Sequence, residues 1–309
     1  MSFENALTSK SSSLENSAYA WSLTAVTAWG VNAVLLKFLT GVLPLQALNG
    51  VRMAVASVAL LSITAFIRRK TTFLPKLETR EWLLIALVGV LGTTLYQLLF
   101  SSGIKLSSAS FSALVSSTSP IWVGLIGSFF GVKLTQNQLI GSGVAILGVL
   151  LLTRESLNLG VDFLGVLLLL GSQVAWAFYT LASKPLMTKL APLEFTGFTF
   201  ALGSLPYLLY AIPVFFTPAI SNIPTPYWFG ACGTALLAQV LGFVGWFTGA
   251  NILGAARVSV MLNITPVIGV LLAAVVLHEK LTVIEGVAAL VILFGVYLAN
   301  RKEQFVARA

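Results

Sequence analysis

The chain has 309 residues, of which 57% are hydrophobic and only 9% are charged, and its formal net charge is +8. Soluble domains carry about 25% charged residues, so this composition excludes an ordinary soluble protein and predicts an all-α membrane protein. The positive charge would indicate nucleic-acid binding in a soluble chain, but here the basic residues flank apolar runs and report membrane orientation. We therefore expect a lipid bilayer and a small-molecule substrate as partners, and no nucleic acid.

Ten apolar runs are long enough to be membrane spans of about 20 residues. We expect spans at residues 18–39, 45–67, 82–103, 107–130, 136–153, 162–182, 192–216, 227–248, 253–276 and 282–299. A polar N-terminal tail, residues 1–17, precedes them without the pattern of a cleaved signal peptide, and a C-terminal tail, residues 302–309, follows. The single cysteine, Cys232, excludes an intrachain disulfide.

The two halves of the chain repeat each other. Pro120 aligns with Pro266, and one inserted residue later "KLT" at Lys133–Thr135 aligns with "KLT" at Lys280–Thr282. Further aligned pairs are Gly103 with Gly249, Ala109 with Ala255, Gly148 with Gly295, Arg154 with Arg301, Lys37 with Lys184, and "AWG" at Ala28–Gly30 with "AWA" at Ala175–Ala177. We therefore expect two five-span repeats, residues 18–154 and 155–301. Because each has an odd number of crossings, the second is inverted relative to the first, as in many secondary transporters.

The basic residues also predict the orientation. If the N-terminus is cytoplasmic, the cluster from Arg68 to Arg80 and the basic C-terminal tail lie inside, as the positive-inside rule requires. The basic residues left on the outside are Lys37, Lys105, Arg154 and Lys280. An even number of spans then places both termini in the cytoplasm.

Pro120 and Pro266 lie near the middle of spans 4 and 9. Proline removes a backbone N–H and kinks a helix, and in hydrocarbon the freed carbonyl must face protein or a water-filled cavity. The kinks are either satisfied locally by neighbouring side chains or mark helix breaks at the substrate path, and the match between the repeats favours the breaks. The neighbouring polar residues are Ser117, Thr118, Ser119, Asn263 and Thr265.

Several segments resemble the EamA-type permeases of the drug/metabolite transporter superfamily. They are "TAWGVNAVLLKF", "ALNGVRMAVASVAL", "GIKLSSASFSALVSSTSPIWVGLIG" and "GAARVSVMLNITPVIGVLLAAVVLHEKLTVIEG". The resemblance runs from about residue 18 to 303 and implies a ten-span permease of the bacterial inner membrane, usually an exporter of small metabolites such as amino acids. It also implies a cavity lined by spans 1–4 and 6–9, with spans 5 and 10 at the periphery. The first half departs from the pattern, because "GVKLT" has no acid where the second half has Glu279.

The charged residues narrow the substrate class. All acidic residues lie in tails, loops or span ends, whereas transporters of lipophilic cations typically need a buried carboxylate. Multidrug or lipophilic-cation efflux therefore stays only as the alternative. Arg52 is the one charge well inside a span, and it either braces backbone carbonyls at a kink, which the resemblance favours, or meets the carboxylate of a substrate.

Uncharged polar and aromatic residues within the spans complete the candidate substrate site. They are Trp29, Asn32, Tyr96, Gln97, Trp176, Tyr179, Gln239, Trp246 and Asn263. Intramembrane amides often only hold helices together, but Trp29 and Trp176 fall near mid-span, where an interface-anchoring role fails. Such a lining suits a zwitterionic or aromatic solute. We expect a secondary transporter that exports small metabolites, with amino acids first, by alternating access of the two repeats, as a monomer or weak homodimer.

An enzyme is not expected. The only histidine, His278, lies at a span end, and no H-E-x-x-H motif or paired aspartate supplies catalytic or metal-binding groups. We expect no cofactor and no metal. A passive scaffold or receptor has no need of two matching breaks. The acid/base candidates for energy coupling, Glu279, Glu285 and His278, lie at a membrane surface.

Overall fold

The computed structural model describes residues 3–69, 72–131, 134–158, 160–253, 258 and 261–300, with the side chains of residues 3–13 and of residue 300 excluded. Within these ranges every regular element is a helix. The motif residue Lys133, the aligned residues Ala255 and Arg301, and the tail at 302–309 lie outside the described residues. The repeat can therefore be compared in space only at its other positions.

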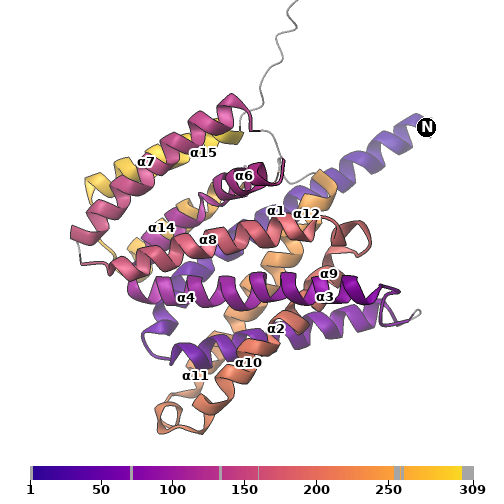
Figure 1. Cartoon of the computed structure of the whole chain (residues 1–309), viewed down its shortest axis with the longest axis horizontal. Coiled ribbons are helices and arrows are strands. Elements are labelled where there is room, and N and C mark those ends of the chain that lie inside the picture. Colours follow the sequence, from indigo (N-terminus) through magenta and orange to yellow (C-terminus); the bar gives the residue numbers. More distant parts are fainter. Residues whose placement is uncertain are drawn as a thin grey trace, which may run out of the picture.

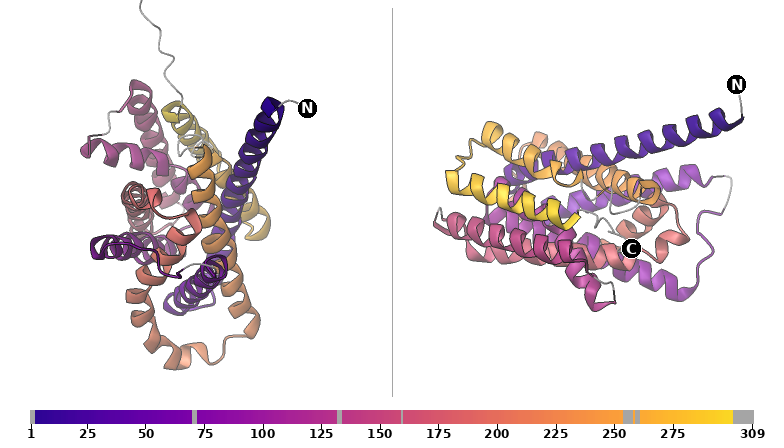
Figure 2. Two further views of the ribbon diagram at one scale, coloured as in Figure 1. Left: turned by 90° about the vertical axis from the view of Figure 1, so that its right-hand side faces the viewer. Right: turned by 90° about the horizontal axis from the view of Figure 1, so that it is seen from above.

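The helices follow the predicted spans closely. The first half contains α1 Phe3–Thr40, α2 Leu45–Ile67, α3 Thr79–Gly89, η1 Val90–Leu95, α4 Tyr96–Leu106, α5 Ala109–Ser116, α6 Ser119–Phe129 and α7 Gln136–Asn158. The second half contains α8 Phe163–Ser183, η2 Leu186–Thr188, α9 Pro192–Gly203, α10 Leu205–Ala211, η3 Ile212–Phe216, η4 Pro218–Ile220, α11 Thr225–Thr234, η5 Ala235–Gly242, α12 Phe243–Leu253, α14 Ile264–Val276 and α15 Val283–Asn300. The helix α1 begins at Phe3, so from there it runs through the predicted polar tail into the first predicted span, and it projects beyond the other helices (Figure 2).

The described helices establish a multi-pass membrane protein. Six segments are long and apolar enough to cross a bilayer, and up to eight if each of two bent pairs is one span. The helices α14 and α15 are also apolar but shorter. The six are Leu14–Thr40, Leu45–Ile67, Thr79–Leu106, Gln136–Asn158, Phe163–Ser183 and Thr225–Leu253.

Both helices that carry the aligned prolines begin just before them. The first bent pair is α5 and α6, which meet at 41°, and Pro120 lies in the first turn of α6, where a missing N–H costs no helical hydrogen bond. In the second half a turn at Leu262 and Asn263 precedes α14, whose third residue is Pro266. The two breaks therefore fall at the same place in the repeat.

Three features were not predicted. Span 7 bends by 40° between α9 and α10, next to Ser204, whereas α2 is continuous at the aligned place. Spans 3 and 8 each contain a π-helical segment, η1 and η5. When the two halves are aligned by the offset that places Pro120 on Pro266, the residues of η1 fall within those of η5. Nothing in composition signals a π-turn, because it is an extra residue accommodated in an otherwise ordinary apolar helix.

Contacts between helices come in pairs that the alignment of the two halves relates: a helix of the first half packs against one of the second, and their aligned counterparts also pack together. The first span packs against the eighth (α1 with α12), and the third packs against the sixth (α4 with α8). Likewise α1 packs against α14, and α6 packs against α8. The helices α7 and α15, at the places of the fifth and tenth predicted spans, lie side by side at the periphery of the bundle (Figure 1).

Glycines make these crossings close. A Cβ on Gly103 would lie 2.6 Å from Leu169 Cγ, and a Cβ on the aligned Gly249 would overlap Ser22, which itself aligns with Leu169. Within the peripheral pair, Gly148 meets Ile292, and the aligned Gly295 meets Ala145. Small residues allow helix backbones to approach closely in a membrane, so the repeat extends to the contacts that hold the bundle together.

Candidate functional site

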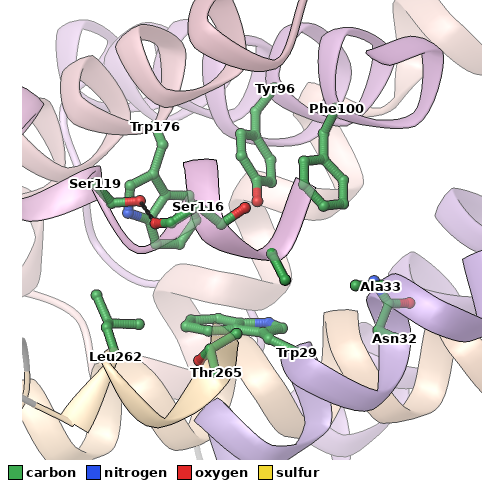
Figure 3. Close-up of a pocket in the computed structure, with 11 residues that line it drawn as sticks. Trp29, Asn32, Ala33, Tyr96, Phe100, Ser116, Ser119, Trp176, Leu262 and Thr265 are labelled. Atoms are coloured by element: carbon green, nitrogen blue, oxygen red, sulfur yellow. Dashed lines mark hydrogen bonds between the residues drawn. The ribbon is translucent and has the colours of Figure 1, made fainter. Parts of the chain in front are cut away.

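A central cavity lies where the broken fourth and ninth spans meet spans 1, 3 and 6 (Figure 3). Its volume is about 60 Å³, enough for roughly four water-sized groups. Spans 2, 7 and 8 contribute nothing to this lining, contrary to the expectation that all of spans 1–4 and 6–9 would. The cavity is lined by Trp29, Asn32, Ala33, Tyr96, Phe100, Ala113, Ser116, Ser119, Trp176, Leu262 and Thr265.

Hydroxyl groups add hydrogen bonds to the backbone carbonyls at the break between α5 and α6. Ser117 Oγ donates to the Leu114 carbonyl at 2.7 Å, and Thr118 Oγ1 donates to the Val115 carbonyl at 2.6 Å. Ser119 Oγ lies 2.6 Å from the Ser116 carbonyl and 2.5 Å from Gln173 Oε1, so its single proton is shared between these two acceptors. The kink is therefore satisfied locally, and it also lies at a cavity, whereas its place on a substrate path stays a prediction.

Aromatic rings form the walls of the cavity. The rings of Trp29 and Trp176, which align in the repeat, meet edge to face with centroids 5.7 Å apart. Trp176 also lies 5.2 Å from the ring of Tyr96. Figure 3 shows Trp29 on one side of the cavity, with Tyr96 and Phe100 opposite it. These rings leave a narrow apolar slot with polar groups at its edges.

The π-helix η5 helps to fix Trp29. Trp29 Nε1 donates to the carbonyl of Ala238 in η5 at 3.0 Å. A π-turn leaves a carbonyl without its usual helical partner, so such a carbonyl is free to accept this bond. Gly242, at the end of η5, packs on the Trp29 ring and has no room for a Cβ.

Arg52 is buried behind the cavity and does not line it. It is 1% exposed, and its two terminal nitrogens donate to Asn49 Oδ1 at 3.2 Å and to Asn32 Oδ1 at 3.3 Å. Asn49 in turn donates to Ser101 Oγ at 2.8 Å. The expectation that Arg52 braces backbone carbonyls is wrong, because its described hydrogen bonds go to two side-chain amides. Arg52 also lines neither the cavity nor the vestibule, so it does not directly contact a solute bound there.

The other predicted site residues are divided between the cavity, its entrance and the surrounding core. Trp29, Asn32, Tyr96 and Trp176 line the central cavity, and Trp246 and Pro120 line the larger space described next. The amide of Gln239 and the hydroxyl of Tyr179 are buried without a hydrogen-bond partner among the described residues. The predicted residues that line neither space are Arg52, Gln97, Tyr179, Gln239, Asn263 and Pro266.

A larger space of about 480 Å³, which we call the vestibule, continues from the cavity. It shares Ser119, Trp176 and Leu262 with the cavity and runs between α6, α8 and α12. It reaches Lys184 after the end of α8 and Asn251 near the end of α12. The vestibule therefore leads from the cavity to the face where spans 6 and 8 end.

The opposite end of the cavity is closed by hydrogen bonds across the repeats. Glu279, in the loop after α14, accepts from the backbone N–H groups of Ala109 at 2.8 Å and Ser110 at 3.0 Å, and from Ser110 Oγ at 2.7 Å. These donors form the N-terminus of α5, where free N–H groups and the helix dipole favour an anion. The loop turns sharply at His278, whose φ is 53°. We call these contacts the Glu279 latch.

Lys37 reinforces the same end. Its Nζ, at the end of α1, donates to the carbonyls of Ile104 and Lys105 at 3.1 Å each and to the carbonyl of Ser107. These carbonyls end α4, where a cation complements the helix dipole. The sequence placed Lys37 and Glu279 at a membrane surface but gave no sign that they close a cavity.

Residues that the sequence analysis did not single out for the site make up much of the lining. Phe100, Ser116, Thr265 and Leu262 line the cavity together with two small alanines. Helical spacing held a partial signal: Phe100 stands one helical turn after Tyr96 and so shares its face. The alanines gave no signal, because they are common everywhere in an apolar chain.

Comparison with known proteins agrees with the two-part architecture. The profile of the EamA-like transporter family matches residues 16–154 and 163–301, once in each half. An uncharacterized transporter of Archaeoglobus fulgidus is 27% identical over 283 residues, which cover 90% of this chain and 96% of that protein. A protein of Streptantibioticus cattleyicolor named a probable terminal-alkyne amino-acid exporter is 26% identical over 232 residues, or 73% of this chain and 75% of that protein. A solved crystal structure matches with a TM-score of 0.64 at 19% identity, covering 92% of this chain and 97% of that chain, and so shares the fold.

Proposed function

The chain belongs to the EamA-like transporter family, and from this premise we propose that it is a secondary transporter that exports small metabolites, with amino acids as the substrate class. Its family and its relatives are transporters and not enzymes. One observation carries the substrate class: the cavity combines an amide, hydroxyls and aromatic rings, and no carboxylate stands among its lining residues. The relative named as a probable amino-acid exporter supports the same class.

We further propose ten spans arranged as two inverted five-span repeats. The short apolar helices α14 and α15 then complete spans 9 and 10, and each bent pair forms one span. Support comes from the aligned breaks at the two prolines, the aligned π-segments and the exchange-related helix contacts. An odd number of crossings in each repeat makes the second enter from the opposite face.

This arrangement suggests alternating access. The vestibule end of the cavity is open and the end with the Glu279 latch is closed, so the structure corresponds to a state that faces one side only. The basic cluster around Arg68 assigns the vestibule end to the cytoplasm under the positive-inside rule. We therefore propose an inward-facing conformation of an inner-membrane protein with both termini in the cytoplasm, functioning as a monomer or weak homodimer.

Transport by the purified protein in liposomes tests the function. Vesicles loaded with an unlabelled amino acid are expected to accumulate the same labelled amino acid by counterflow for at least one of the twenty. Counterflow of a lipophilic cation and of no amino acid would favour multidrug efflux instead, and no flux of either kind would contradict the proposal. Trp29→Ala and Trp176→Ala are expected to lower transport at least tenfold, whereas Trp82→Ala, in a ring cluster with Phe198 away from the cavity, serves as the matched control.

Labelling of engineered thiols tests the topology. In a Cys232→Ser background, Leu74→Cys lies in the loop between spans 2 and 3, and Ser221→Cys lies in the loop between spans 7 and 8. Both side chains are exposed. An impermeant thiol reagent is expected to reach them from opposite faces of the membrane. Labelling of both from the same face would contradict the inverted repeat.

A further inference from the structure

The orientation of the Asn32 amide is fixed by Arg52. A guanidinium group has only donors, so the atom of Asn32 that Arg52 meets at 3.3 Å must be Oδ1, whose lone pairs accept the bond. The Nδ2 group of the same amide therefore points away from Arg52. Asn32 lines the cavity, and its Nδ2 has no hydrogen-bond partner among the described residues. The cavity is thus offered an uncommitted N–H donor at this end.

The hydroxyl groups that line the cavity present hydrogen-bond acceptors, whereas Asn32 presents a donor. Ser116 Oγ donates to the Ser112 carbonyl at 2.8 Å, Ser119 Oγ donates to the Ser116 carbonyl, and Thr265 Oγ1 donates to the Val26 carbonyl at 3.2 Å. Each hydroxyl has one proton and two lone pairs, so the proton is already used and only lone pairs remain for a solute. Figure 3 shows Asn32 at one end of the cavity and Ser119 toward the other.

Charge reinforces this polarity. Arg52 is positive, 1% exposed, and bonded to two neutral amides, and no carboxylate neutralises it among its described hydrogen bonds. A buried cation without a counter-ion favours an anion close by, because its field is weakly screened in a low-dielectric interior. The Asn32 end of the cavity is therefore the end that favours a negative group.

We infer that the cavity reads the α-amino carboxylate head of its solute, with Asn32 Nδ2 binding the carboxylate and the hydroxyl oxygens and aromatic faces receiving the ammonium. Arg52 is a positioning residue: it holds the Asn32 amide and supplies the positive field without touching the solute. Aromatic faces attract cations, and hydrogen bonds to a charged group are about twice as strong as neutral ones. This inference rests on the proposed transport of amino acids and names the groups that recognise them.

The sizes of the two spaces agree with this reading. A cavity of about 60 Å³ accommodates a head group of a few heavy atoms but not a large side chain. The solute side chain then extends past Trp176 and Leu262 into the vestibule of about 480 Å³. The head group is selected tightly and the side chain loosely, so several amino acids are expected to share the site.

Matched sets of three probes test the inference on the unaltered protein. One set is phenylalanine, phenethylamine and 3-phenylpropionate, and the other is leucine, isoamylamine and 4-methylpentanoate. Each set keeps one side chain and removes the carboxylate or the ammonium in turn. Only the amino acids are expected to inhibit counterflow strongly, with at least tenfold weaker inhibition by the amine and by the acid. Equal inhibition by the amine would overturn the role given to the Asn32 end.

Variants locate the carboxylate contact. Asn32→Ala is expected to raise KM at least tenfold with little change in the maximal rate, and Asn32→Asp is expected to do the same while improving inhibition by the amines. Gln239→Ala is the matched control, because Gln239 is also a buried intramembrane amide but lines neither the cavity nor the vestibule, and its KM is expected to stay within threefold. Arg52→Lys is expected to raise KM, because a lysine keeps the charge but cannot hold both amides in one planar fork.

The outcomes separate the two proposals. If the unaltered protein moves no amino acid, the proposed function fails. An unchanged unfolding temperature shows that Asn32→Ala is folded. If the unaltered protein moves amino acids and this folded variant keeps the original KM, the inference about Asn32 fails while the proposed function stands. Should Asn32→Ala not fold, Asn32→Ser and the probe inhibition of the unaltered protein decide the question.

Discussion

The two ends of the central cavity are built from aligned parts of the repeat and yet differ in how they are closed. At one end Glu279 binds the N-terminus of α5, and Lys37 binds the last carbonyls of α4. At the other end the cavity continues into the vestibule between α6, α8 and α12. The residue that aligns with Glu279 in the first repeat is Val132, and a valine side chain has no hydrogen-bond acceptor. The repeat thus supplies two similar frames, and within the described residues a charged latch is seen at one of them.

This difference has a consequence for the transport cycle. A transporter must be able to close either end, and a latch on one side alone biases the resting protein toward the state that is closed there. Each hydrogen bond to a charged group contributes about 1.5–3 kcal/mol, so three of them can decide between two states that differ by a few kcal/mol. We therefore expect the inward-facing state to be the resting one.

The largest effect is expected where α14 crosses α5 near the latch. A Cβ on Gly269 would lie 2.7 Å from the Cβ of Ala113, so Gly269→Leu would force the two broken spans apart. We expect transport to fall at least twentyfold in counterflow. Gly286→Leu is the matched control, because a Cβ at Gly286 meets nothing within 4 Å, and its activity is expected to stay within twofold. Equal activity of the two variants would show that this crossing does not govern closure.

Removing the latch itself is expected to have the next largest effect. Glu279→Ala leaves the N–H groups of Ala109 and Ser110 without their acceptor and should lower transport about tenfold by opening the latched end. The measurement is alkylation of Ala113→Cys in a Cys232→Ser background by an impermeant reagent added to the outer face. Labelling is expected only when Glu279→Ala is present. Labelling from outside with Glu279 intact would contradict the closed end.

A smaller effect is expected from Lys37→Met. Methionine keeps most of the apolar stem but leaves the carbonyls of Ile104, Lys105 and Ser107 without their donor. We expect a two- to fivefold loss of transport, since the latch still closes the end. Combining Lys37→Met with Glu279→Ala should give more than the product of the single losses if both residues close the same gap. A purely multiplicative result would assign them to separate steps.

The smallest effect is expected at the exposed pair of Lys189 and Glu81, on the vestibule face. Glu81 accepts a hydrogen bond from Lys189 and holds the pKa of Lys189 above its usual value. Because the pKa of Lys189 is raised in the folded protein, the pair stabilises the folded state fully below the ordinary lysine pKa of about 10.4. This stabilisation is lost as the pH rises through the pKa that Lys189 has in the folded protein. Lys189→Ala is expected to leave transport at pH 7 within twofold of the unaltered protein. A tenfold loss would show that this face also has a latch.

The sequence predicted the helical architecture because a chain in lipid must satisfy its backbone hydrogen bonds internally, and a helix does so. The apolar runs in the sequence show directly where such helices lie. It also located the broken fourth and ninth spans, since proline acts locally and can be read from one residue. The packing could not be read in this way. Gln239 and Asn32 are both intramembrane amides, but only Asn32 lines the cavity, because the rotation of each span is set by contacts with helices distant in the sequence. The Glu279 latch depends on a residue and a helix terminus that are 170 positions apart.

The π-segments η1 and η5 each accommodate one extra residue in an otherwise regular helix. Were one residue deleted from η1 so that the helix became regular, Tyr96 and Phe100 would still face the central cavity, because the π-turn already absorbs the extra residue. One residue deleted from a regular helix such as α7 would instead turn every side chain after it by about 100° about the axis. These two short stretches are therefore points where a helix of this bundle tolerates the loss of one residue.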